Sequence, residues 1–168
     1  MLPTAAKVAE RAGYSVRSIF ERFPDLHDLQ VAAADHAIAQ VVAMAASREA
    51  GGDRATRIKF HVGVRARASD RWSSLWRALI ANQSGSADLK ARVQILRERV
   101  LSLMDHIYEP ELSTLSATER KHTLVALEAL VDVESWVRMR EHFGLSVDEA
   151  CAVWVQAIDR LLPPTPER

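Results

Sequence analysis

Apolar residues recur along most of this chain at the three- and four-residue spacing of amphipathic helices, and no stretch alternates as a β-strand does. Prolines are absent between Pro24 and Pro110, so nothing there forces a helix to end. The glycines stand mostly where helices would stop, at Gly51-Gly52, Gly85 and Gly144. The pattern therefore predicts an all-α chain built from long helices.

Helix caps divide the long central part of the chain. Asp25 and Asp53 can each accept a hydrogen bond from a first-turn amide and so begin a helix. The expected helices run from about Leu26 to Glu49, from Asp53 to Ser69, from Arg71 to Gln83 and from Ala87 to Tyr108.

Two capping boxes mark the last third of the chain. A serine stands three residues before a glutamate in Ser116-Ala-Thr-Glu119 and again in Ser146-Val-Asp-Glu149. Within each motif the serine side chain can accept from the backbone amide of the glutamate, and the glutamate side chain can accept from the backbone amide of the serine. The first helix is expected to run to Phe143 and to end at Gly144.

These two helices predict a dimer. The first is apolar nearly all round from Leu124 to Val133, so we expect it to be buried on both sides, and the second carries a regular apolar stripe. One copy of this size has too few other helices to cover the apolar surface of both, so a twofold helix-bundle interface is expected. The alternative is an ordinary core hairpin. The expected interface residues are Leu127, Leu130, Val131, Ala150, Trp154, Ala157, Ile158 and Leu161.

The first residues have the layout of a helix-turn-helix. Thr4 can cap a short helix that Gly13 ends, and Ser15 can cap a second helix that Pro24 ends. In that second helix the apolar side chains share one face, whereas the arginines fall mainly elsewhere. A helix of this kind suits the DNA major groove.

The run from Ala12-Gly-Tyr-Ser-Val-Arg-Ser-Ile-Phe-Glu-Arg-Phe-Pro to Asp-Leu-His-Asp-Leu29 resembles, without gaps, the pattern of the TetR/AcrR family of transcriptional repressors. The stretch from Trp136 to Ala150 is similar to one in the helices through which that family dimerises. The resemblance implies a partial helix-turn-helix domain over 1–30, and a ligand-binding and dimerisation body over 31–168. It implies that the side chains facing operator DNA are Thr4, Val16, Arg17, Phe20 and Arg22. It implies core positions at Val8, Ile19, Phe23 and Leu29.

The head departs from the family pattern. Phe20, Leu26 and His27 stand where the family usually has tyrosine, lysine and glutamate, and the family's first helix has no counterpart before Thr4. We therefore expect a loosened head that binds duplex DNA weakly in this form. The alternative is that the segment is only a packed helical cap.

Composition narrows the remaining possibilities. The 168 residues include 22 basic and 22 acidic side chains, so DNA binding would depend on placement rather than on net charge. No apolar run approaches the roughly 20 residues that cross a bilayer, and no signal segment opens the chain, which predicts a cytoplasmic protein without a membrane partner. The lone Cys151 stands among apolar residues, as an inert thiol would.

Catalysis is not predicted. The histidines lack the paired spacing of metal ligands, and no phosphate loop, nucleophile elbow or Cys-x-x-Cys is present, so we expect no metal, no cofactor and no enzyme activity. The exception is Glu128 and Asp132, four residues apart on an apolar helix. They suggest either a carboxyl pair with a raised pKa or, more commonly, an edge that is solvated or paired with arginine.

Aromatic side chains on the middle helices suggest a pocket for an apolar small molecule, with ordinary core packing as the alternative. The candidate ligand-binding residues are Phe60, His61, Trp72, Trp76, Met104 and Tyr108. The sequence thus predicts a ligand-responsive repressor that binds operator DNA as a homodimer. The main alternative is a headless dimeric module that binds a small molecule or a protein but not DNA; a helical-bundle enzyme ranks last.

Overall fold

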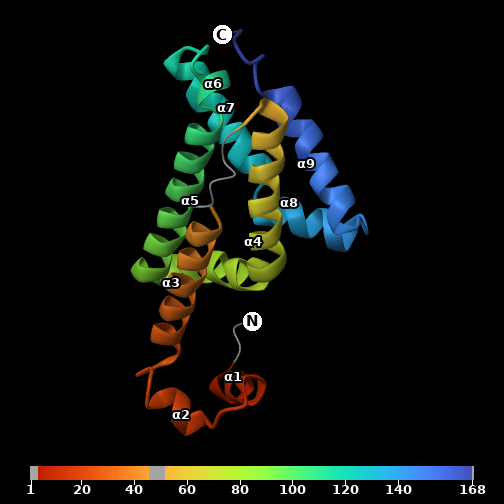
Figure 1. Cartoon of the computed structure of the whole chain (residues 1–168). Coiled ribbons are helices and arrows are strands. Elements are labelled where there is room, and N and C mark those ends of the chain that lie inside the picture. Colours follow the sequence, from red (N-terminus) through yellow and green to blue (C-terminus); the bar gives the residue numbers. More distant parts are fainter. Residues whose placement is uncertain (1–3, 46–51, 168) are drawn as a thin grey trace.

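The computed structural model describes residues 4–45 and 52–167 of the chain (Figure 1). Within these ranges every regular element is a helix, which confirms the all-α prediction. In chain order the elements are α1 (Ala5–Ala12), α2 (Val16–Phe20), α3 (Leu26–Ala45), α4 (Arg54–Asn82), the 3-10 turn η2 (Gln83–Gly85), α5 (Ala87–Ile107), α6 (Glu109–Leu112), α7 (Ala117–Leu130), α8 (Val133–Val137), the π-helical turn η3 (Arg138–His142) and α9 (Val147–Leu161).

The two short helices α1 and α2 form a small unit at one end of the molecule (Figure 1). Thr4 Oγ1 accepts from the amide of Lys7 at 3.4 Å, and Ser15 Oγ accepts from the amide of Ser18 at 3.0 Å. Gly13 closes α1 with a φ of 71°, a left-handed conformation that favours glycine. Among the described residues, those before Val31 lie outside both large core clusters, so this head packs by itself.

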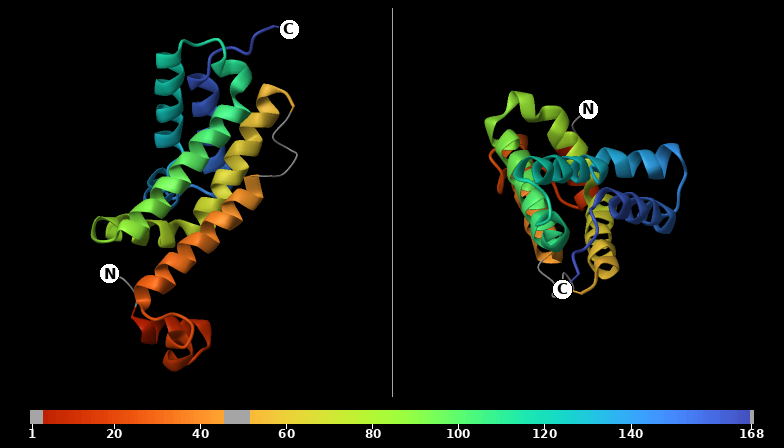
Figure 2. Two further views of the ribbon diagram at one scale, coloured as in Figure 1. Left: turned by 90° about the vertical axis from the view of Figure 1, so that its left-hand side faces the viewer. Right: turned by 90° about the horizontal axis from the view of Figure 1, so that it is seen from above.

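Helix α3 joins the head to the body and lies alongside α5 (Figure 2). From its middle onward the helix buries Ala34, Ala37 and Val41. The predicted helix extended to Glu49, but residues 46–49 lie outside the described part of the chain, as does Gly51.

The predicted division of the next segment at Ser69–Arg71 is wrong. Arg54–Asn82 is one helix, α4, because neither a proline nor a glycine interrupts it there and Ser69 is buried in the core. Helix α4 packs against α3, α5, α8 and α9, so it is the centre of the body.

The predicted helix from Ser116 to Phe143 is also divided. Helix α7 ends at Leu130, and Val131 turns out of the helix with φ −98° and ψ 22°. The Asp132 side chain then accepts from the amide of Glu134 at 3.4 Å and begins α8. Side-chain capping by an aspartate therefore replaces a continuous helix, and this break frees the carbonyl of Val131.

Two clusters of buried side chains form the core. The larger one joins helices from α4 to α9, and within it the ring centres of Trp136 on α8 and Trp154 on α9 lie 5.0 Å apart. The smaller one joins α3, α4 and α5 around Trp76. None of the helices in the described residues is long and apolar enough to cross a membrane.

Candidate functional site

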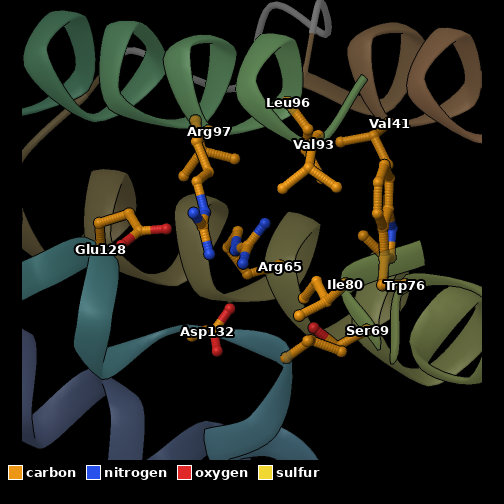
Figure 3. A pocket seen from close by; sticks show the side chains of 13 residues that line it. Val41, Arg65, Ser69, Trp76, Ile80, Val93, Leu96, Arg97, Glu128 and Asp132 are labelled. Carbon is orange, nitrogen blue, oxygen red and sulfur yellow. The ribbon is translucent and has the colours of Figure 1, made fainter. Parts of the chain in front are cut away.

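A cavity lies between α3, α4 and α5, close to where α7 gives way to α8. It has two adjoining parts. The larger cavity, about 320 Å³, runs between Val42 and Ala45 on α3 and Leu103 and His106 on α5. The smaller cavity, about 40 Å³, reaches from Trp76 and Val93 to Glu128 (Figure 3). Both share four wall residues: Val41, Arg65, Leu96 and Val100.

The walls of the larger cavity are mostly apolar. Seven of the eleven described wall residues are apolar, with Val42 from α3 and Leu96, Val100 and Leu103 from α5 among them. The α5 residues are spaced three and four apart, so they form one face of the helix. A concave, largely apolar space of this size falls at the lower end of ligand pockets, which span about 300–1,000 Å³.

Arg65 is the polar centre of the cavity. The residue is 8% exposed, and its Nε and Nη2 donate to the carbonyl oxygen of Val131 at 3.3 and 2.7 Å. That carbonyl is available because α7 ends there. Burial lowers the pKa of Arg65, while the charges of Asp132 and Glu128 oppose the shift. An arginine nonetheless remains charged in a protein, so a buried cation faces this cavity.

The charged side chains are divided unequally between the two parts. Figure 3 shows Arg65, Arg97, Glu128 and Asp132 pointing toward one another in the smaller cavity. In the described residues, no carboxylate oxygen lies within 4.0 Å of a nitrogen of Arg65 or Arg97. Among the described residues, the walls of the larger cavity instead hold Arg65, Arg99, Ser102 and His106 and no acidic residue.

Glu128 and Asp132 were expected to form either a carboxyl pair with a raised pKa or an edge that is solvated or paired with arginine. Both are half-buried on the wall that faces Arg65, without a direct ion pair to it in the described structure. Their interaction with Arg65 is therefore through space rather than through a hydrogen bond.

The six predicted ligand-binding residues do not share one cavity, which corrects that prediction. Trp76 lines the smaller cavity, whereas Phe60 lines a separate hollow of about 470 Å³ with Gly63 and Arg67. Trp72 packs beside Trp76 on the smaller cluster. Phe60, His61, Met104 and Tyr108 are buried in the body. The reason is that α4 is one continuous helix. At about 1.5 Å per residue, His61 and Trp76 lie roughly 22 Å apart along it.

His61 and Tyr108 form a buried pair within the core. His61 Nδ1 and Tyr108 Oη lie 2.7 Å apart, and His61 Nε2 has no partner among the described residues. Burial, aided by the charge of Arg65, lowers the pKa of His61 from 6.5 to about 3. Burial raises the pKa of Tyr108, and the charge of Glu111 adds to that shift. Both side chains are therefore neutral at ordinary pH.

The predicted DNA-facing residues are all exposed on the head. Val16 and Phe20 present apolar surface, and Arg17 Nε donates to Glu21 Oε1 at 2.8 Å. The guanidinium carbon of Arg22 lies 5.6 Å from the centre of the Tyr14 ring. Of the predicted head core, Ile19 is buried; Val8, Phe23 and Leu29 are half-buried.

The predicted dimer interface is wrong for most of its residues. Leu127, Val131, Ala150, Trp154 and Ile158 are fully buried within this chain. Helix α9 packs its apolar stripe against α4 and α7 of the same copy, so these side chains cannot face a second one.

The remaining three predicted interface residues stay accessible. Leu130 and Ala157 are half-buried, and Leu161 is 45% exposed. Burial on every face of the Leu124–Val133 segment is also incorrect, because Val125 is 54% exposed.

Sequence reasoning missed the buried polar residues Arg57, Arg65 and Glu111. A usable signal existed for two of them: Arg57, His61 and Arg65 are spaced four apart, and a helix brings such residues to one face. Their neighbours Ile58, Val62 and Val64 show that this part of α4 is buried nearly all round. Glu111 has no comparable signal.

No group of three histidine, cysteine or carboxylate side chains in the described ranges could hold a metal ion. Comparison with protein-family models, with curated proteins and with solved structures finds no match to this chain.

Proposed function

We propose that this chain is a ligand-responsive transcriptional regulator of the TetR/AcrR type, which acts in the cytoplasm as a homodimer. The head binds operator DNA, and the cavity between α3, α4 and α5 binds a small-molecule effector.

The observation that carries the proposal is the position of α3. One end of this helix follows the head directly, and its other end supplies Val41 and Val42 to the cavity wall. A molecule held between α3 and α5 therefore touches the same rigid element that bears the head (Figure 2).

The contacts between α3 and α5 allow such a coupling. Arg92 of α5 donates to both carboxylate oxygens of Asp35 on α3, at 3.1 and 3.2 Å. Along α3, this ion pair lies between the head and the cavity residue Val41. Filling the cavity would change the spacing of the two helices around this ion pair. Any effect of the effector on DNA affinity must then be matched by an equal effect of DNA on effector affinity.

The head supports DNA binding through its exposed side chains. The side chain of Arg17 is 88% exposed, and its only described partner is the exposed Glu21 on the same helix. Such an exposed pair contributes little to stability, so exchanging Glu21 for a phosphate or a base costs little. Arg17 is thus available for DNA.

Replacing Arg17 by alanine is expected to weaken operator binding by about 1–3 kcal/mol, because an arginine that reads a base edge supplies that much. The measurement is a titration of duplex DNA from the region upstream of the protein's own gene, at several salt concentrations and at protein concentrations that detect the weak binding expected of this head. Affinity should fall steeply with salt, since phosphate contacts release counterions. The matched control is Arg138→Ala, an exposed arginine of the body.

The same titration decides against the main alternative. If the folded protein shows no preference for the upstream duplex over random duplex, and Arg17→Ala behaves as Arg138→Ala does, the chain is better described as a headless dimeric binding module. The cavity would still serve that function.

The proposed dimer surface is the outer side of α9. Val153, Ala157 and Leu161 are spaced four apart and form an accessible stripe beside the buried one, and Val125 on α7 is also exposed. A self-complementary apolar stripe is suited to a twofold contact.

Replacing Ala157 by arginine is expected to convert the dimer to monomer, because the change places a charge in the dry centre of that stripe. Light scattering should show the mass of the species halve while circular dichroism shows an unchanged helical content. Ser84→Arg, at an exposed position on η2, should leave the mass unaltered. A dimer that survives Ala157→Arg would rule out this surface.

A further inference from the structure

The charges around the cavity limit which chemical class of ligand it can bind. The two parts of the cavity differ in size and in their charged residues: the described walls of the smaller part hold two arginines and two carboxylates, and those of the larger part hold arginines without a carboxylate. Arg65 belongs to the walls of both. This step rests on the proposed ligand-binding function and concerns the same site.

Arg65 is a buried cation with donors to spare. Nε and Nη2 are held by the carbonyl of Val131, whereas Nη1 makes no hydrogen bond to any described residue. A buried charge without a direct ion pair is costly unless a counter-charge reaches it. The position therefore favours an anion.

The size of each part decides where a ligand's charged group can lie. The two carboxylates, Glu128 and Asp132, line only the smaller cavity, whose 40 Å³ suits a few water molecules, at roughly 10–15 Å³ each, but no larger molecule. A cationic ligand would need these carboxylates. The larger cavity, at 320 Å³, is the part with room for a ligand, and the permanently charged residues of its described wall are Arg65 and Arg99.

We infer that the larger cavity binds an apolar monocarboxylic acid, of about the size of a medium-chain or single-ring acid. The carboxylate lies toward Arg65 and Arg99, where charge-assisted hydrogen bonds are available. The apolar body lies along Val42, Leu96 and Leu103. A single carboxylate has two oxygens and can therefore accept from both arginines of the described wall.

The test compares three probes that share an eight-carbon chain and differ in charge: octanoate, octanamide and octylamine. Binding to the full chain is measured by titration calorimetry at neutral pH. Octanoate is expected to bind at least about tenfold more tightly than the other two.

Arg99→Gln should weaken octanoate binding about tenfold and leave octanamide unaffected, because it removes a charge and keeps a polar side chain. Lys90→Gln, an exposed charge change elsewhere on α5, is the matched control and should alter neither. Val42→Trp should fill the cavity and abolish binding of octanoate, and Val42 is 42% exposed, so the larger side chain is tolerated by the fold. Arg99 is exposed as well, which keeps this test independent of any folding defect at Arg65.

Two results would overturn the inference, and they differ in what they leave standing. If octanamide or octylamine binds as tightly as octanoate, or Arg99→Gln matches Lys90→Gln, the choice of a carboxylate is wrong while the cavity remains a ligand site. If none of the three probes binds, both the carboxylate and the ligand-binding part of the proposed function fail.

Discussion

Replacing Glu111 by alanine is expected to lower the free energy of unfolding by about 3–5 kcal/mol, the usual cost of removing one partner of a buried ion pair. The Glu111 side chain is fully buried, and its Oε1 accepts from Arg57 Nη2 and from Thr165 Oγ1. Arg57 is also buried, so the substitution would leave its charge without a counter-charge in the core.

Chemical denaturation followed by circular dichroism measures this change. Glu109→Ala, two residues away and exposed, is the control and should change stability by less than about 0.5 kcal/mol. The double variant Arg57→Met with Glu111→Leu should be more stable than Glu111→Ala, because both charges are then removed together. A loss below about 1 kcal/mol for Glu111→Ala would contradict a buried ion pair at this position.

Glu111, Arg57, Arg54 and Thr165 form a polar cluster at the end of the body that lies far from the head (Figure 1). Arg54 Nε donates to Asp159 Oδ1 at 2.7 Å, and its Nη2 donates to the carbonyl of Asp159 at 2.6 Å. Together these contacts fix the start of α4 to α6 and to the C-terminal segment. We therefore expect α4, the back wall of the cavity, to be held firmly at this end.

Local signals in the sequence predicted where several helices begin. The capping serines at Ser116 and Ser146 stand where the helices begin, and each exchanges hydrogen bonds with the glutamate three residues later. Caps depend on a few neighbouring residues, so one sequence is enough to identify them. The break at Val131–Asp132 escaped prediction because an aspartate in a helical pattern is ambiguous until its side chain is seen to cap.

The interface and the cavity were harder to predict for a different reason. An apolar stripe such as that of Trp154 and Ile158 satisfies the same period whether it packs on its own chain or on a second copy. Aromatic residues such as Phe60 and Trp76 are likewise suited to a core and to a pocket wall. Periodicity identifies the buried face of a helix but not its partner, so the cavity between α3 and α5 depends on tertiary packing.

Stability is expected to fall by about 2 kcal/mol at pH 5 because of His61 alone. Burial holds the pKa of this histidine at about 3 in the folded chain, against 6.5 in the unfolded chain. Between these two values the unfolded chain binds one more proton, so the free energy of unfolding rises with pH. The contribution of His61 is complete above pH 6.5 and is lost progressively as the pH falls toward 3.

The physical reason is that no described carboxylate stabilises a positive charge on His61. Its Nδ1 is paired with the neutral Tyr108 Oη, and the nearby charge that acts on it is the cation Arg65. Denaturation at pH 7 and pH 5 should therefore be compared between the original chain and His61→Gln, which keeps a polar partner for Tyr108 but does not titrate. The original chain should lose about 2 kcal/mol more than His61→Gln over this interval. Parallel losses in both proteins would mean that His61 is not the buried neutral group described here, and the acid sensitivity would then have to come from exposed charges, whose effect salt would weaken.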